Sequence, residues 1–159
     1  MTAAAGLPAY EISNHARLGE ESRHNLAYWR YNDYAGIGPG AHGRRGGMAT
    51  VRHKKPENWL AAVADKGNGL SEERALTVSE QASEALLMGL RLREGVDLAD
   101  LARRFGFTPA ELINGAKADF YTDEGLLWRD GDQIGVTASG MPLLDGLLGE
   151  LVAEALVSP

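Results

Sequence analysis

The chain has 159 residues, which is the size of one ordinary domain or two small ones. A hydrophobic content of 44% is enough for a real core, and a net charge of −6 argues against a general nucleic-acid binder. The sequence has no cysteine, which excludes disulfides, thiolate zinc sites and an iron–sulfur cluster held by the chain's own thiolates.

The sequence also lacks the marks of membrane insertion and secretion. No apolar run approaches the roughly 18–20 residues of a membrane-spanning helix. The first residues have no basic segment followed by a long apolar one, as a secretory signal would. We therefore expect a soluble, cytoplasmic protein without a membrane span.

The two halves of the chain differ in charge. Residues 1–75 carry a net charge of +2, and residues 76–159 carry a net charge of −8. Between them, the glycine-containing segment 67–75 is typical of an exposed connector. We therefore predict two domains, 1–75 and 76–159.

The first half predicts few regular elements. The residue patterns indicate a strand at 9–13, a helix at 21–31, strands at 34–37 and 48–52, and a helix at 56–66 with Trp59, Leu60 and Val63 facing inward. So few strands leave open sheet edges, which a complete domain usually pairs or covers. Residues 1–75 are therefore predicted to be the end of a larger domain.

The second half predicts a series of capped helices. Thr77 and Glu80 form a capping-box pattern before a helix at 78–92. A second helix, at 98–105, begins after Asp97 and ends at Gly106. A third begins after Thr108 with Pro109 and Glu111 in its first turn, and runs to about Thr122. The predicted inward residues of the first helix are Ala82, Ala85, Leu86, Gly89 and Leu90.

A hairpin and a last helix follow. Short strands at 126–128 and 133–136 are joined through Asp130-Gly131, a two-residue turn signal. The last helix begins at Thr137. Three helices, a hairpin and a further helix predict an α+β protein with a small, mostly helical, winged-helix-like C-terminal domain. The leucines expected to face inward on the last helix are Leu143, Leu144, Leu147, Leu148 and Leu151.

The segment at 21–31 is the first candidate site. On a helix, His24 and Tyr28 are one turn apart, as are Asn25 and Trp29. An imidazole beside two large aromatic rings suits a flat aromatic ligand or a metal-bearing macrocycle. The alternative interpretation places both aromatic rings in the core, with His24 as a hydrogen-bonding residue.

The glycine-rich segment 36–43 is the second candidate site. Gly38 and Gly40 allow close approach to a ligand or a tight turn at a strand end, and His42 is a possible ligand. The spacing matches neither a P-loop nor a dinucleotide fingerprint. The basic residues that follow, from Arg44 to Lys55, suit either carboxylates and phosphates or a solvated face.

Nucleic-acid binding is not expected, although a winged-helix order invites it. The would-be recognition helix, AELINGAKADFYTDE, carries Lys117 against several carboxylates. Neutralising phosphates requires the opposite sign of charge.

Three segments together resemble the HemW family. They are YEISNHA at 10–16, ESRHNLAYW at 21–29 and DYAGIGPGAHG at 33–43. Members of this family are radical-SAM proteins, regarded as haem chaperones and long described as oxygen-independent coproporphyrinogen III oxidase-like. The later part of the chain is similar to the family's C-terminal region. One departure is His15, where the family usually has phenylalanine.

The resemblance implies a longer, full-length parent protein with an additional N-terminal domain. Its radical chemistry uses a Cys-x-x-x-Cys-x-x-Cys motif in an N-terminal (β/α) barrel to hold a [4Fe–4S] cluster and S-adenosylmethionine. Without cysteine, this chain is expected to be inactive by itself and to be the C-terminal part of such a protein. Residues 1–75 would then be the last elements of the barrel plus a linker helix, and 76–159 a non-catalytic cap.

The resemblance also implies a role in haem trafficking and porphyrin metabolism. Haem or a porphyrin would be the ligand, His24 would bind the haem iron, and a haem-acceptor protein would be a partner. The expected cofactor-binding residues are His24, Asn25, Tyr28, Trp29, Gly38, Gly40 and His42. The alternative is a stand-alone interaction module, in which the acidic winged-helix-like domain binds another protein.

Overall fold

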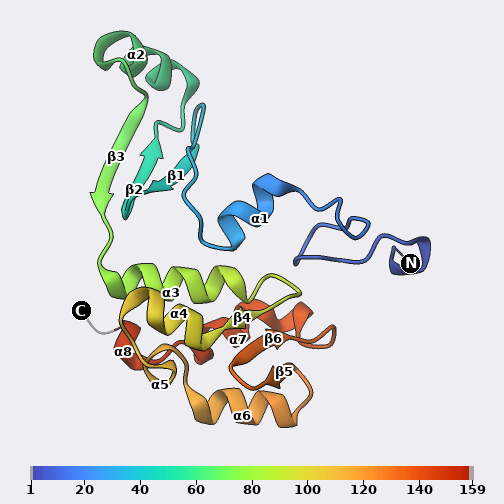
Figure 1. The fold of residues 1–159 in the computed structure, drawn as a ribbon. Helices are drawn as coiled ribbons and strands as arrows, with labels where there is room; N and C mark the ends of the chain where they lie inside the picture. The colour runs from blue at the N-terminus through green and yellow to red at the C-terminus, as the bar shows by residue number, and fades with distance from the viewer. Residues whose placement is uncertain (1, 158–159) are drawn as a thin grey trace. The chain divides into compact units, whose positions relative to one another are not determined.

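The computed structural model describes residues 2–157 (Figure 1). The chain forms two compact units. One, here called the core unit, combines the segment up to Tyr31 with the chain from Val78 onward, and the other, the sheet unit, is Asn32–Thr77. The predicted division after residue 75 lies close to one boundary. The segment before Asn32 belongs to the same unit as the second half. A bridge from Glu11 to Leu92 and a hydrogen bond from the Arg93 amide to the Tyr10 carbonyl join the two.

The N-terminal segment of the core unit holds one helix, α1 (Arg23–Trp29), within the predicted range 21–31. A single 3-10 turn, η1 (Ala3–Ala5), precedes it. The strand predicted at 9–13 is absent. Instead Ala9 pairs with His15 in one isolated bridge and Glu11 pairs with Leu92 in another. The chain bends at Tyr10, Ile12 and Ser13 and pairs through these single bridges, so no strand ladder forms there.

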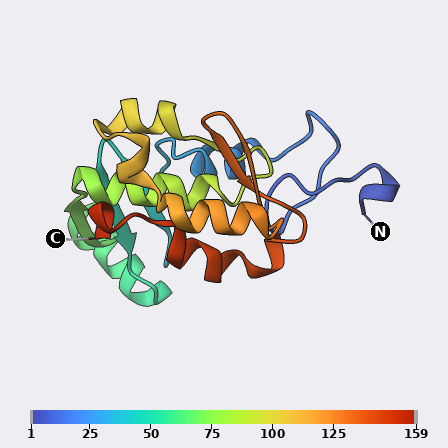
Figure 2. The ribbon, with the colours of Figure 1, turned by 90° about the horizontal axis from the view of Figure 1, so that it is seen from below.

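The rest of the core unit is a helical group beside a small sheet. The helices are α3 (Val78–Gly89), α4 (Leu98–Phe105), α5 (Pro109–Leu112), α6 (Gly115–Asp123), α7 (Leu144–Leu151) and α8 (Glu154–Val157). The sheet orders β4 (Val96–Asp97), β6 (Gln133–Val136) and β5 (Leu127–Asp130), all antiparallel. Figure 2 shows α6 and α7 side by side, and Lys117 of α6 bonds Glu150 of α7.

The core lies among these helices. Ala82, Ala85, Leu86, Gly89 and Leu90 are all buried, which confirms the inward face predicted for α3, although the helix ends at Gly89 and not at residue 92. Asp97 caps α4 by accepting a hydrogen bond from the Asp100 amide at 2.8 Å, and Gly106 ends it with φ +77°, as predicted. No helix of the described residues is long and apolar enough to cross a membrane.

Three details of the second half differ from prediction. The third helix is interrupted: Ile113 is extended and bridges Val152, so Asn114 caps a separate helix, α6. The hairpin turn is Gly131-Asp132, one residue later than predicted, because Asp130 still pairs with Gln133. A 3-10 turn, η2 (Met141–Leu143), precedes α7 and leaves Leu143 54% exposed, so it does not face inward as the other four leucines do.

The sheet unit is a three-stranded antiparallel sheet with one helix. Its strands β1 (His42–Arg45), β2 (Met48–Arg52) and β3 (Leu70–Ala75) lie in chain order, and α2 (Pro56–Lys66) matches the predicted helix. The prediction of β2 is confirmed, but residues 34–37 form only one bridge, from Tyr34 to Arg44. The strand β3 was predicted as a connector because its polar sequence, LSEERA, carries no apolar alternation; ladder bonds to β2 hold it.

One predicted inward residue of α2 is exposed. Leu60 is 59% exposed, whereas Ala62 is buried and Trp59 is half-buried. Trp59 lies against the backbone of Gly69, where a Cβ would come within 2.1 Å of the indole. The helix therefore packs through its tryptophan and small residues, which the apolar periodicity alone did not distinguish.

Candidate functional site

The helix α1 carries the first group of predicted site residues. Ser22 begins it by accepting a hydrogen bond from the Asn25 amide at 3.3 Å. The His24 ring is exposed and meets the edge of the Tyr28 ring at 5.7 Å between centroids. Tyr28 in turn lies 4.7 Å from Trp29. The predicted pairing of His24 with an aromatic residue one turn later is therefore present in the structure.

The neighbouring residues of α1 attach it to the rest of the core unit. The side chain of Asn25 donates to the hydroxyl of Tyr10 at 3.2 Å. Trp29 is half-buried under the guanidinium of Arg91, which lies 5.6 Å from its ring, and its Nε1 is buried with no hydrogen-bond partner among residues 2–157. Asn25 and Trp29 thus position the helix, while His24 faces solvent.

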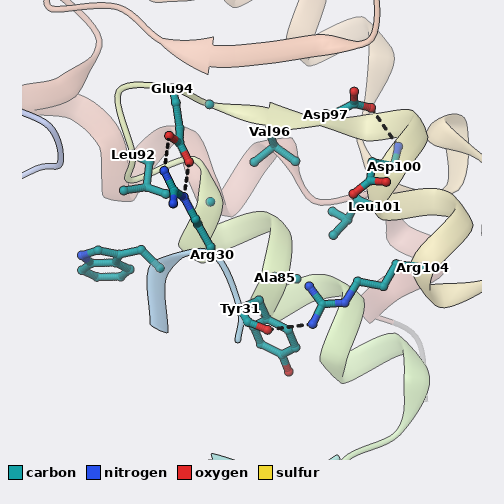
Figure 3. A pocket seen from close by; sticks show the side chains of 13 residues that line it. Arg30, Tyr31, Ala85, Leu92, Glu94, Val96, Asp97, Asp100, Leu101 and Arg104 are labelled. Carbon is teal, nitrogen blue, oxygen red and sulfur yellow. Dashed lines mark hydrogen bonds and ion pairs between the residues drawn. The ribbon is translucent and has the colours of Figure 1, made fainter. Parts of the chain in front are cut away.

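The end of α1 is held by two arginine contacts (Figure 3). Arg30 donates from Nε and Nη2 to the two carboxylate oxygens of Glu94, at 2.7 and 2.8 Å. The hydrogen bond to Glu94 and its negative charge raise the pKa of Arg30 above its ordinary value. Arg104 donates to the carbonyl of Tyr31 at 2.7 Å and lies over the Tyr31 ring.

Tyr31 has an unusual backbone conformation for a bulky residue. Its φ is +57°, a left-handed conformation that costs roughly 1 kcal/mol or more outside glycine. It is only 3% exposed, and its hydroxyl donates to Glu84 at 2.8 Å. These partners are 53 and 73 positions away in sequence, so no local signal indicated them. Tyr31 is the last residue of the first of the two segments that make up the core unit.

A small cavity of about 150 Å³ lies next to these residues. Arg30, Glu94 and Arg104 lie in its wall, and Val96 and Leu101 make it partly apolar. Its volume is below the roughly 300–1,000 Å³ of most ligand sites. His24 and Tyr28 are not part of this wall, so this cavity does not include the predicted ligand face of α1.

The glycine-rich segment belongs to the sheet unit. Gly38 and Gly40 have φ of +93° and +72°, as a tight turn requires. At Gly36 a Cβ would come within 2.2 Å of the His42 carbonyl, so the chain packs closely against itself here. His42 is exposed at the start of β1. The tight-turn interpretation therefore accounts for the glycines without a ligand.

The basic residues that follow are partly used within the sheet unit. Arg44 is 4% exposed, donates to the Asn32 carbonyl at 3.3 Å and lies over the Tyr34 ring. Arg52 donates to the Gly36 carbonyl. The expectation of a single solvated or ligand-binding basic face does not hold for these two, because each is bonded to the backbone of its own unit.

The predicted site residues thus fall into two groups, one in each unit. His24, Asn25, Tyr28 and Trp29 lie together on α1, and Gly38, Gly40 and His42 lie together around the start of β1. Within the described residues, no group of three or more histidine, aspartate or glutamate side chains is arranged to hold a metal ion.

Comparisons with known proteins give the chain a context. Residues 76–143 match the HemN C-terminal domain family. The chain is 33% identical to the haem chaperone HemW of Bacillus subtilis, over 95% of this chain and 40% of that protein. It is 32% identical to the mitochondrial radical S-adenosyl methionine domain-containing protein 1 of Danio rerio, over 94% of this chain and 36% of that protein.

A solved structure shares the fold. Coproporphyrinogen III oxidase (HemN) from Escherichia coli, described as a radical SAM enzyme, aligns with a TM-score of 0.70 and 18% identity, covering 93% of this chain and 37% of that one. The chain spans about 40% of the length of the curated relatives it matches. The predicted resemblance to the C-terminal part of HemW-like proteins is confirmed.

Proposed function

We propose that this chain, a HemW-like sequence with a HemN C-terminal domain at residues 76–143, works as the C-terminal part of a radical-SAM protein that handles haem or a related porphyrin. Haem is the cargo in this proposal and α1 contacts it. The core unit from Val78 onward acts as a non-catalytic, winged-helix-like cap that shapes the site or docks a haem-accepting protein. The names of two relatives, a haem chaperone and a radical-SAM protein, support this function.

The observation that carries the proposal is the pairing of the exposed His24 with the half-buried ring of Tyr28 one turn later on α1. A neutral imidazole is a common axial donor to haem iron. The Tyr28 ring, 5.7 Å from His24, adds an aromatic surface that suits the face of a porphyrin. Asn25 and Trp29 are engaged with Tyr10 and Arg91, so their part is to hold the helix that presents this pair.

An iron–sulfur cluster does not fit this chain, because cysteine thiolates are its usual ligands and the sequence has none. We therefore place the [4Fe–4S] cluster and S-adenosylmethionine in the N-terminal barrel of a full-length parent. After anaerobic reconstitution with iron and sulfide, the chain is expected to yield no 5′-deoxyadenosine from S-adenosylmethionine. Chain-dependent product in that assay contradicts this assignment.

Haem titration of the chain tests the role of α1. Adding haemin is expected to give a saturable Soret shift, and His24→Ala is expected to weaken binding by about tenfold or more, since it removes the axial donor. Tyr28→Ala should weaken it less, and Tyr28→Phe should restore the wild-type affinity because the aromatic ring remains. His53→Ala, on a residue outside both candidate groups, is the matched control.

Two outcomes would change the proposal. If His42→Ala abolishes the Soret shift while His24→Ala leaves it intact, the haem ligand belongs to the glycine-rich segment of the sheet unit. If neither substitution matters, and circular dichroism shows both variants folded, α1 is a structural helix and the proposal for its histidine is wrong.

A further inference from the structure

A larger cavity of about 660 Å³ lies elsewhere in the core unit, between the N-terminal segment and the β5–β6 hairpin. This volume falls within the roughly 300–1,000 Å³ typical of small-molecule sites. The wall is mostly apolar, and none of the residues predicted to bind haem lines it. Its wall includes the charged side chains of Glu11 and Arg93 and the apolar side chains of Trp128, Val136 and Met141.

Arg93 supplies a positive charge without a partner. Its backbone N–H donates to the Tyr10 carbonyl at 3.0 Å, which fixes the residue beside the N-terminal segment. Its guanidinium forms no ion pair or hydrogen bond with any residue that the structure describes. Two nearby arginines differ in this respect, because Arg30 is bound by Glu94 and Arg91 by Asp145. An unpaired guanidinium in a mostly apolar wall favours a carboxylate, which it can bind through two parallel hydrogen bonds.

Trp128 supplies a flat apolar surface in a fixed position. Its indole lies across its cross-strand partner Gly135, where a Cβ would come within 2.4 Å of the ring, and across Gly95, where the distance would be 2.9 Å. Only glycine leaves room for the ring at these two positions. Within residues 2–157 the indole N–H makes no hydrogen bond, so it is also available as a donor. Such a ring suits a planar partner in stacked or edge contact.

Glu11 adds a negative charge to the same wall. It is 1% exposed, and Oε1 accepts hydrogen bonds from Ser13 and Asn14. Oε2 is buried with no hydrogen-bond partner in the described part of the chain. Its carboxylate opposes a second negative charge in the cavity, so the wall favours a singly charged anion over phosphate.

We propose that this cavity binds a planar, apolar monocarboxylate, with the carboxylate on Arg93 and the ring system against Trp128, Val136 and Met141. This site is distinct from the proposed haem contact on α1 and does not depend on it. It assigns a role to three features that the proposed function leaves unused, namely the free guanidinium, the glycine-backed indole and the cavity itself.

The test uses the 159-residue chain and 1-naphthylacetate as the probe. The chain has three tryptophans, so ¹⁵N–¹H spectra show three indole N–H signals, and Trp128→Phe identifies the one from Trp128. The probe is expected to shift that signal in a saturable manner and to leave the Trp59 signal in place. The matched neutral compound, 1-naphthylacetamide, and inorganic phosphate are each expected to bind at least tenfold more weakly.

Variants then separate the charge from the packing. Arg93→Gln is expected to weaken binding of 1-naphthylacetate by about tenfold or more, because a hydrogen bond to a charged group is lost. The control is Arg103→Gln, since Arg103 pairs with Asp100 outside this wall. Glu11→Gln keeps the Oε1 acceptor and is expected to strengthen binding. Equal affinity for the acid and the amide, or an unchanged affinity in Arg93→Gln, overturns the proposal.

Discussion

The two units of this protein are stabilised in different ways. Within residues 2–157, the cluster of buried apolar side chains lies wholly in the core unit, and more than half of its buried residues are leucines. Among buried apolar residues the sheet unit has Ala62 and Leu76. Strand ladders, glycine contacts and bonds from Arg44 and Arg52 to the backbone hold that unit together. Hydrophobic burial therefore stabilises one unit, whereas backbone pairing and close glycine packing stabilise the other.

The sharpest way to test this difference is to remove one leucine from each unit. Leu86→Ala is expected to lower the free energy of unfolding by about 2–5 kcal/mol, because the side chain is fully buried and leaves a cavity. Leu60→Ala, at an exposed position in the sheet unit, should cost less than about 0.5 kcal/mol. Urea unfolding followed by circular dichroism measures both. Similar losses would show that the sheet unit depends on apolar burial too.

A glycine substitution addresses the sheet unit in the same way. Gly69→Ala would place a Cβ 2.1 Å from the Trp59 indole, and the resulting overpacking is expected to cost about 1–3 kcal/mol. Hydrogen exchange should become faster across β2 and β3 while the amides of α3 keep their protection. Gly115→Ala is the control, because a Cβ there would meet nothing within 4 Å and its φ is not positive. Faster exchange in α3 would mean that the units do not unfold separately.

Tyr31→Phe tests the hydrogen bond that attaches Tyr31 to Glu84 of α3. The substitution keeps the ring but removes the hydroxyl bonded to Glu84, which should cost about 1 kcal/mol or somewhat more. Arg104 still holds the backbone carbonyl, so the variant should remain folded. Thermal unfolding measures the loss. In a Glu84→Gln background the effect of Tyr31→Phe should shrink, and an undiminished effect would show that the hydroxyl acts through another partner.

The smallest expected effect is a pH dependence at the start of α5. Hydrogen bonds from the Thr108 backbone and hydroxyl lower the pKa of Glu111 below its ordinary value of 4.5. A carboxyl whose pKa is lower in the folded state adds stability above its unfolded pKa, and loses it as the pH falls through the folded value. Thermal unfolding of the wild type between pH 7 and 3 should therefore decline more steeply than that of Glu111→Gln. Parallel curves would contradict this capping role.

Features that depend on residues close together in the sequence were predicted, and features that depend on distant residues were not. The caps at Asp97 and Gly106, the capping box of Thr108 and Glu111, and the buried face of α3 were all predictable, because each depends on residues a few positions apart. The interruption at Ile113 was not, since it depends on a bridge to Val152. The strand β3 was missed for a similar reason: its residues are polar, and only β2 makes them a strand.

In the candidate site, too, the sequence predicted short-range pairing and did not predict contacts between distant residues. The pairing of His24 with Tyr28 followed from helical spacing, because residues four apart share one face of a helix. Which side of α1 would be buried did not follow, since that depends on contacts from Arg91 and Tyr10. Nor did the sequence indicate the free guanidinium of Arg93 or the indole of Trp128 in one cavity wall, because these residues are 35 positions apart.

The amino-acid sequence by itself determined the absence of a thiolate cluster, the capped helices of the second half and the motifs that resemble HemW. These are matters of composition and short-range spacing, which a reader of the chain sees directly. Only the tertiary structure decided that the segment before Asn32 packs with the second half, and which charged side chains keep a partner. The bridge from Glu11 to Leu92 joins residues that are far apart in the sequence. Which side chains become buried, and which charges find a partner, therefore depends on the folded chain.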